Sequence, residues 1–227
     1  MDATIIENIP FDIQAKHLYP ILKIKPDSRF ADRLDILLAA SLDIANPKVA
    51  YKLSAIEHSD DNSVIVDGVC LKSRVMQVNL QNCRRSFPFI ATCGMELEKW
   101  SHTLTDTLDI FWADTIHMMA LGAALDAFKH HMIDTFETRM TSTMNPGSLE
   151  DWPISEQHKL FSILGDACGT IGVQLNENGM MVPLKSVSGI EFESGEKFNS
   201  CQLCPRDKCP SRRAPYDEQL YAVKYHV

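Results

Sequence analysis

Apolar residues recur every three or four positions in several stretches of the chain, which is the period of an amphipathic helix. The first such stretch covers residues 28–42, and Ser28 or the preceding Asp27 could cap its start. The longest stretch runs through residues 110–139 without a proline and predicts a long central helix. Shorter helices are expected at residues 73–80, 95–108 and 153–164.

Alternating or β-branched runs between these stretches predict strands. Residues 49–55 alternate between apolar and polar, and residues 64–66 form a β-branched run before the turn signal Asp67-Gly68. Asn178-Gly179 is typical of a tight hairpin turn. The polar stretch 138–152 is expected to be a loop. Further strands are expected at residues 87–93, 173–175, 180–182 and 187–192.

Composition indicates an ordinary globular protein. Hydrophobic residues make up 45% and charged residues 23% of the 227 positions, and one domain over residues 1–227 is expected. The net charge of -8 and the lack of a long basic block argue against a nucleic-acid partner. No apolar run approaches the roughly 20 residues of a membrane span, and the N-terminus does not resemble a signal peptide, so a cytoplasmic protein is expected.

The chain has seven cysteines, and without an export signal a disulfide scaffold is not expected. Four of them stand among apolar neighbours and are expected to be small core residues. These four are Cys70, Cys83, Cys93 and Cys168.

The other three cysteines, Cys201, Cys204 and Cys209, form a C-x-x-C-x-x-x-x-C motif in a Cys-rich segment at residues 199–215. This spacing allows three thiolates to face one metal, and soft thiolates favour zinc or an iron–sulfur cluster. The fourth ligand could be Cys168, a histidine such as His226, water or a substrate atom. Three reduced thiols on an ordered loop are the alternative.

Four blocks of sequence carry a resemblance to a known family. They are FIATCGMELEKWS (89–101), NPGSLEDWPISEQ (145–157), MMVPLKSVSG (180–189) and CQLCPRDKCPSRR (201–213). In this order they resemble the stand-alone relatives of the activation domain of vitamin B12-dependent methionine synthase, over residues 24–213. The resemblance implies a single α+β domain with a curved antiparallel sheet flanked by helices, one of them long and central.

The function that this resemblance implies is reductive reactivation of a corrinoid protein or a B12-dependent methyltransferase in trans. Members of the family bind S-adenosylmethionine (AdoMet) and present its methyl group to the reduced cobalt of a corrinoid carried by the partner, while an electron donor supplies the electron. A sulfonium methyl is already an activated electrophile, so the protein has to position the reactants and needs no catalytic acid or base.

The resemblance also implies which residues contact AdoMet. In the loop they are Asn145, Pro146 and Gly147, whose turn is retained. In the segment that follows the hairpin, backbone groups and small side chains would lie beside the ligand. These residues are Val182, Pro183, Ser186, Ser188 and Gly189.

The loop departs from the family pattern at two positions. Most stand-alone relatives read Arg-x-Ser-Pro-Gly-Tyr, whereas this chain has Thr143 in place of the arginine and Ser148 in place of the tyrosine. Neither residue can grip a carboxylate as arginine does. Arg139 could substitute for the missing arginine, or it could simply complement the C-terminal end of the long helix.

Two other functions are compatible with the sequence. One is a non-catalytic docking module for a corrinoid protein that has lost AdoMet binding, as Thr143 and Ser148 would allow. The other is a metal-bearing or iron–sulfur redox partner, which depends on the three clustered cysteines alone.

Overall fold

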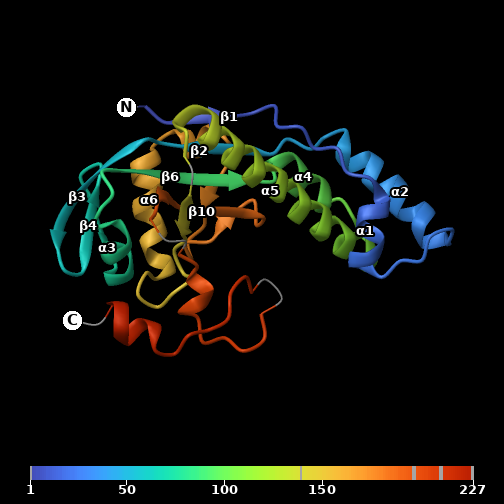
Figure 1. Cartoon of the computed structure of the whole chain (residues 1–227). Helices are drawn as coiled ribbons and strands as arrows, with labels where there is room; N and C mark the ends of the chain where they lie inside the picture. The colour runs from blue at the N-terminus through green and yellow to red at the C-terminus, as the bar shows by residue number, and fades with distance from the viewer. Residues whose placement is uncertain (1, 139, 196–197, 210–211, 226–227) are drawn as a thin grey trace.

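An antiparallel sheet forms the centre of the molecule (Figure 1). The computed structural model describes residues 2–138, 140–195, 198–209 and 212–225, and only the backbone of residues 58 and 59. Strand β6 (Arg85–Thr92) pairs with β2 (Lys48–Tyr51) and then β3 (Ser54–Asp60) along one edge. Along the other edge β6 pairs with β10 (Ser186–Glu193), which in turn pairs with β7 (Thr141–Met144).

The remaining strands extend this sheet or form a small hairpin. β1 pairs with β2, while β4 and β5 continue the sheet from β3. β8 and β9 pair only with each other, on either side of the Asn178-Gly179 turn. Their bounds are Thr4–Ile6 for β1, Ser63–Val66 for β4, Val69–Lys72 for β5, Gln174–Leu175 for β8 and Met181–Val182 for β9.

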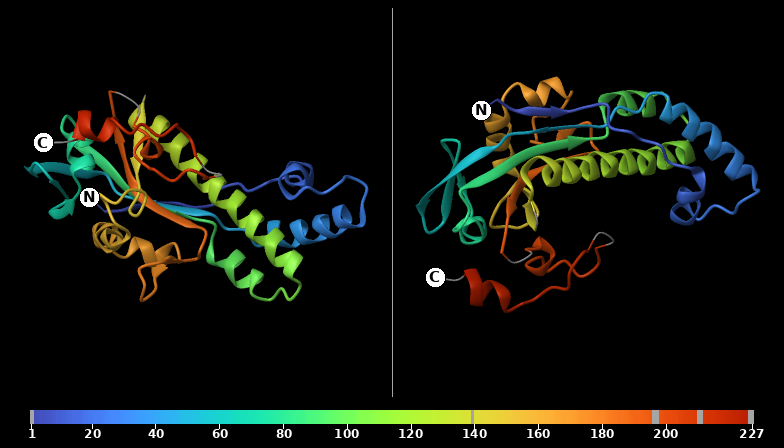
Figure 2. Two further views of the ribbon diagram at one scale, coloured as in Figure 1. Left: turned by 90° about the horizontal axis from the view of Figure 1, so that it is seen from below. Right: turned by 45° about the horizontal axis from the view of Figure 1, so that its top comes forward.

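Helices cover both faces of the sheet (Figure 2). The long helix α5 (Thr107–Phe136) packs on one face, and α6 (Gln157–Leu164) with α7 (Ala167–Thr170) packs on the other. Successive residues of a strand point to opposite faces. Accordingly, Phe89 of β6 packs in the cluster under α5, and the next residue, Ile90, packs in the cluster under α6 and α7.

The other helices pack around these layers. α1, α2 and α4 surround the N-terminal half of α5, where Arg33 of α2 lies 2.9 Å from Asp106 and 2.8 Å from Asp109. Short helical turns follow in η1, η2 and η3. The bounds are Ala15–Leu22 for α1, Arg29–Leu42 for α2, Arg74–Leu80 for α3, Met95–Ser101 for α4, Ile154–Glu156 for η1, Ser200–Gln202 for η2 and Tyr221–Tyr225 for η3.

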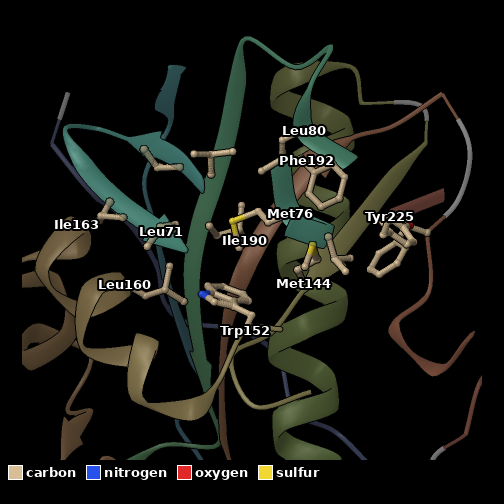
Figure 3. Packing of buried hydrophobic residues seen from close by; sticks show 14 residues of the cluster. Leu71, Met76, Leu80, Met144, Trp152, Leu160, Ile163, Ile190, Phe192 and Tyr225 are labelled. Atoms are coloured by element: carbon tan, nitrogen blue, oxygen red, sulfur yellow. The ribbon is translucent and has the colours of Figure 1, made fainter. Parts of the chain in front are cut away.

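A third core lies where β7 and β10 meet α3 and α6 (Figure 3). Trp152, 1% exposed, sits between Leu160 and Met144 in this cluster. Phe198 and Tyr225 from the C-terminal part of the chain are buried in the same cluster. The C-terminal segment is therefore anchored by apolar side chains before and after its cysteines.

Most predicted elements are present, but three elements and one residue differ. The predicted strand 49–55 divides into the end of β2 at Tyr51 and the start of β3 at Ser54. Residues 95–108 do not form one helix, because α4 ends at Ser101 and Asp106 caps a new helix through Leu108 N. The expected loop 138–152 contains β7, whose polar residues pair with β10. Cys70 was expected in the core, but it is exposed in β5, whereas Cys93 and Cys168 are buried and Cys83 is half-buried.

Among the described helices, α5 is long and apolar enough, by length and composition, to cross a membrane. The core helix of a globular protein passes the same test, and here α5 packs against β2, β6 and α2.

Candidate functional site

The strand pair β7–β10 brings three of the predicted ligand residues together. Glu191 stands opposite Thr143 in the register of the pair, and the amide of Asn145 donates a 2.8 Å hydrogen bond to the carbonyl of Ser188. A Cβ on Gly189 would lie 2.6 Å from Nδ2 of Asn145, which is closer than atoms can approach. Glycine is therefore needed where the loop meets the strand.

Ser188 has a structural role in this arrangement. Its buried hydroxyl donates a 2.8 Å hydrogen bond to Oε1 of Gln157, and Nε2 of Gln157 donates a 2.7 Å bond to the carbonyl of Gly179. Both side chains are 2% exposed. They connect β10 to α6 and to the hairpin, on the face of the sheet opposite α5.

Pro146 and Gly147 form the turn that the sequence predicts. Pro146 is buried, and Gly147 adopts a φ of 79° and donates a 2.8 Å hydrogen bond to the carbonyl of Trp152. The carboxylate of Asp151 then caps α3 by accepting from Ser73 Oγ and from the backbone amides of residues 74 and 75. The turn is thus fixed to the third core.

Val182, Pro183 and Ser186 lie before and at the start of β10, away from Asn145. The peptide bond between Val182 and Pro183 is cis, and Oγ of Ser186 lies 2.8 Å from the carbonyl of Pro183. Ser186 and Gly189 are three residues apart on one strand, or about 10 Å. Ser186 therefore lies apart from Gly189, and the predicted residues do not converge on one point.

A cavity of about 510 Å³ lies between α5, β7 and β10, and we call it the α5–β10 cavity. Phe89 and Phe128 contribute two aromatic rings, with centroids 4.8 Å apart. Charged and polar side chains of both signs surround the rings. These are Asp126, Lys129, Thr138, Thr141, Thr143, Asn145, Glu191 and Arg213.

Glu191 is the most unusual residue of this cavity. It is only 8% exposed, and its carboxylate accepts a hydrogen bond from the hydroxyl of Thr143. In the described part of the chain it forms no ion pair within 4 Å. Because a buried carboxylate is costly without a positive partner, the position suits a cationic group of a ligand.

The residues predicted from the sequence do not include Glu191, Arg213 or the two phenylalanines. An ionisable residue between Ile190 and Phe192 in an apolar strand was the one available signal for Glu191. No local sequence pattern marks Arg213, because its position at the cavity depends on how the C-terminal segment folds.

The three clustered cysteines are half-buried and free. The backbone N–H of Arg213, 3.4 Å from the sulfur, lowers the pKa of Cys201, and the neighbouring guanidinium groups add to this effect. In contrast, burial raises the pKa of Cys93 to about 12 and that of Cys168 to about 11.

The described residues contain no group of three His, Cys, Asp or Glu side chains placed to hold a metal ion. The metal site at Cys201, Cys204 and Cys209 therefore stays a prediction. Cys168, considered as a fourth ligand, is buried in the cluster under α7. Arg139 and His226 lie outside the described residues.

A second cavity of about 870 Å³ lies between the turn at Gly147 and the C-terminal segment. Ser148, Asp151, Cys204 and Tyr216 are among its lining residues. None of the described residues that line it is a lysine or an arginine. It therefore offers no side-chain cation for a carboxylate, in contrast to the α5–β10 cavity.

Comparison with known proteins supports the architecture. No protein-family model and no curated protein matches the sequence. Among solved structures, the chain is similar to the MetH reactivation domain in its crystal structure with bound AdoHcy, with a TM-score of 0.63 and 12% sequence identity. The match covers 88% of this chain and 81% of that one. The two proteins share a fold. This confirms the expected α+β class, with an antiparallel sheet, flanking helices and one long helix.

Proposed function

We propose that this protein binds AdoMet in the α5–β10 cavity and reactivates a corrinoid protein, or a B12-dependent methyltransferase, in trans. The observation that carries the proposal is the structural match over 88% of the chain to a reactivation domain with bound AdoHcy. The four blocks of sequence that resemble the activation-domain family support it. All four blocks contribute a residue to the lining of the α5–β10 cavity, namely Phe89, Asn145, Val187 and Arg213.

The chemistry of the cavity suits AdoMet. Its adenine can pack on Phe89 and Phe128, since aromatic rings favour offset or edge contacts. Its ammonium and sulfonium groups are positive and match Glu191 and Asp126. Its carboxylate requires a cation, and the α5–β10 cavity provides Lys129 and Arg213.

The chain would act by binding and orientation. In the transfer, the bond between sulfur and methyl breaks with its electron pair left on sulfur, and a reduced cobalt of the partner's corrinoid gains the methyl. AdoHcy remains, and no proton moves, so no side chain has to serve as acid or base. An electron donor reduces the cobalt beforehand.

Isothermal titration calorimetry with AdoMet and with AdoHcy tests this proposal. We expect both to bind, and we expect Glu191→Gln to weaken AdoHcy binding about tenfold, or about 1.4 kcal/mol, because the ligand loses one charged partner. Glu177→Gln, an exposed change in the β8–β9 hairpin, is the control and should leave affinity unchanged. Failure of both ligands to bind, even with the corrinoid protein present, would contradict the proposal.

The same measurement separates the alternative function. A docking module that has lost AdoMet would form a complex with the corrinoid protein and give no heat with either ligand. Thr143 and Ser148, which replace the arginine and tyrosine of the family loop, are the features that favour this alternative.

A further inference from the structure

We infer that Arg213 binds the carboxylate of the ligand's amino-acid portion, in place of the arginine that relatives carry at the position of Thr143. This inference rests on the proposed function, because it assumes an AdoMet-type ligand in the α5–β10 cavity. It assigns a ligand-binding role to the C-terminal segment, which comes after both the loop at residues 145–147 and strand β10 in the sequence.

Thr143 cannot supply the missing contact. Its hydroxyl already donates to Glu191, its partner in the strand register. The carboxylate of Glu191 would also repel a ligand carboxylate placed beside it. The ligand's carboxylate must therefore lie toward the cationic side chains, while its ammonium lies toward Glu191.

Arg213 lines the same cavity as Thr143 although 70 positions separate them in the sequence. Its side chain makes no hydrogen bond or ion pair with the other described residues, so its five donors are available. A guanidinium can bind both oxygens of a carboxylate at once, whereas the other cation, Lys129 on α5, presents a single point charge.

Hydrogen bonds hold the backbone around Arg213, whose exposed side chain lines the cavity. The guanidinium of Arg212 donates to the carbonyl of Cys201 at 2.9 Å and to that of Cys204 at 3.1 Å, and it also donates to the carbonyl of Arg206. The backbone N–H of Arg213 donates to the sulfur of Cys201. With Phe198 and Tyr225 buried at either end, the segment brings Arg213 to the lining of the α5–β10 cavity.

Titration of two ligands against matched variants tests the inference. AdoHcy carries the carboxylate, while 5′-methylthioadenosine lacks the amino-acid portion. For Arg213→Ala we expect AdoHcy affinity to fall at least tenfold and 5′-methylthioadenosine affinity to stay the same. Arg213→Lys should recover part of the loss. Arg206→Ala, an exposed arginine on the same segment that does not line the α5–β10 cavity, should bind both ligands like the original chain.

The outcomes separate this inference from the proposed function. Normal AdoHcy affinity in Arg213→Ala overturns the inference and leaves the proposed function standing. Equal loss for both ligands also overturns it, because the effect would not depend on the carboxylate. If the unaltered protein binds neither ligand, the proposed function fails and the inference fails with it. Thermal melting of each variant checks that it is folded.

Discussion

Cys201 and Cys93 show how strongly surroundings change one side-chain type in this chain. Cys93 is fully buried, and the cost of placing a thiolate there raises its pKa to about 12. Cys201 instead accepts the backbone N–H of Arg213 and lies near two guanidinium groups, which lowers its pKa. Because the thiolate is the reactive form of cysteine, the two residues should differ in chemistry.

Alkylation with iodoacetamide should reveal this difference. In protein first treated with a chelator, so that no metal protects the thiols, we expect Cys201 to react with a pH midpoint below the ordinary thiol value of about 8.5, because its thiolate is stabilised. Cys93 and Cys168 should stay unmodified in the folded protein. Mass spectrometry of timed samples across pH measures both effects, with exposed Cys70 as the accessibility control.

The Arg213→Ala variant sharpens this test. It retains the backbone N–H, which is the largest cause of the shift, and loses the side-chain charge. The pH midpoint for alkylation of Cys201 should therefore stay low, close to that of the unaltered protein. A midpoint of about 8.5 or above in the unaltered protein would contradict the assignment.

At the scale of elements, the pairing of β7 with β10 builds one wall of the α5–β10 cavity. The pairing depends on close approach at Gly189, where a Cβ would lie 2.6 Å from Asn145 Nδ2 and 2.7 Å from the carbonyl oxygen of Met144. One of these atoms belongs to the backbone, so it cannot move without disturbing the strand.

Gly189→Ala should therefore destabilise the protein. Overpacking of this kind lowers the free energy of unfolding by about 1–3 kcal/mol. Urea unfolding would show this as a lower urea concentration at the midpoint. Gly122→Ala is a matched control, because a Cβ at this position of α5 would meet nothing within 4 Å, and alanine favours the helix by about 0.4–1 kcal/mol. Equal stability of Gly189→Ala and the unaltered protein would show that β7 and β10 lie farther apart.

At the scale of the whole molecule, the C-terminal segment connects the three clustered cysteines with both cavities. Cys204 lines the larger cavity and Arg213 lines the α5–β10 cavity. If Cys201, Cys204 and Cys209 hold a metal, the metal would lie close to the proposed ligand. An iron–sulfur cluster at this position could deliver the electron that the corrinoid requires.

Metal analysis of protein purified without oxygen tests that hypothesis. We expect zinc, or iron together with sulfide, and we expect its loss in Cys201→Ser and Cys204→Ser. Cys70→Ser is the control, since Cys70 is exposed in β5, outside the segment. Protein that takes up neither zinc nor iron and sulfide under reconstitution would rule out the metal site and its role in electron transfer.

The sequence by itself determined the elements whose signals are local. Ser28 caps α2 through its hydroxyl, as its position before an apolar period predicts, and the long apolar period at residues 110–139 corresponds to α5. Four ordered blocks also sufficed to indicate the architecture that the solved structure confirms. These features depend on neighbours within one turn of helix or a few positions of strand.

Only the tertiary structure decided what depends on distant partners. The polar residues of β7 became a strand because β10 offers hydrogen-bonding groups, and Ser188 became a structural residue because Gln157 lies beside it. The α5–β10 cavity, its buried Glu191 and the place of Arg213 depend on segments far apart in the sequence, such as those of Phe89 and Arg213, which line one cavity; no local pattern encodes this.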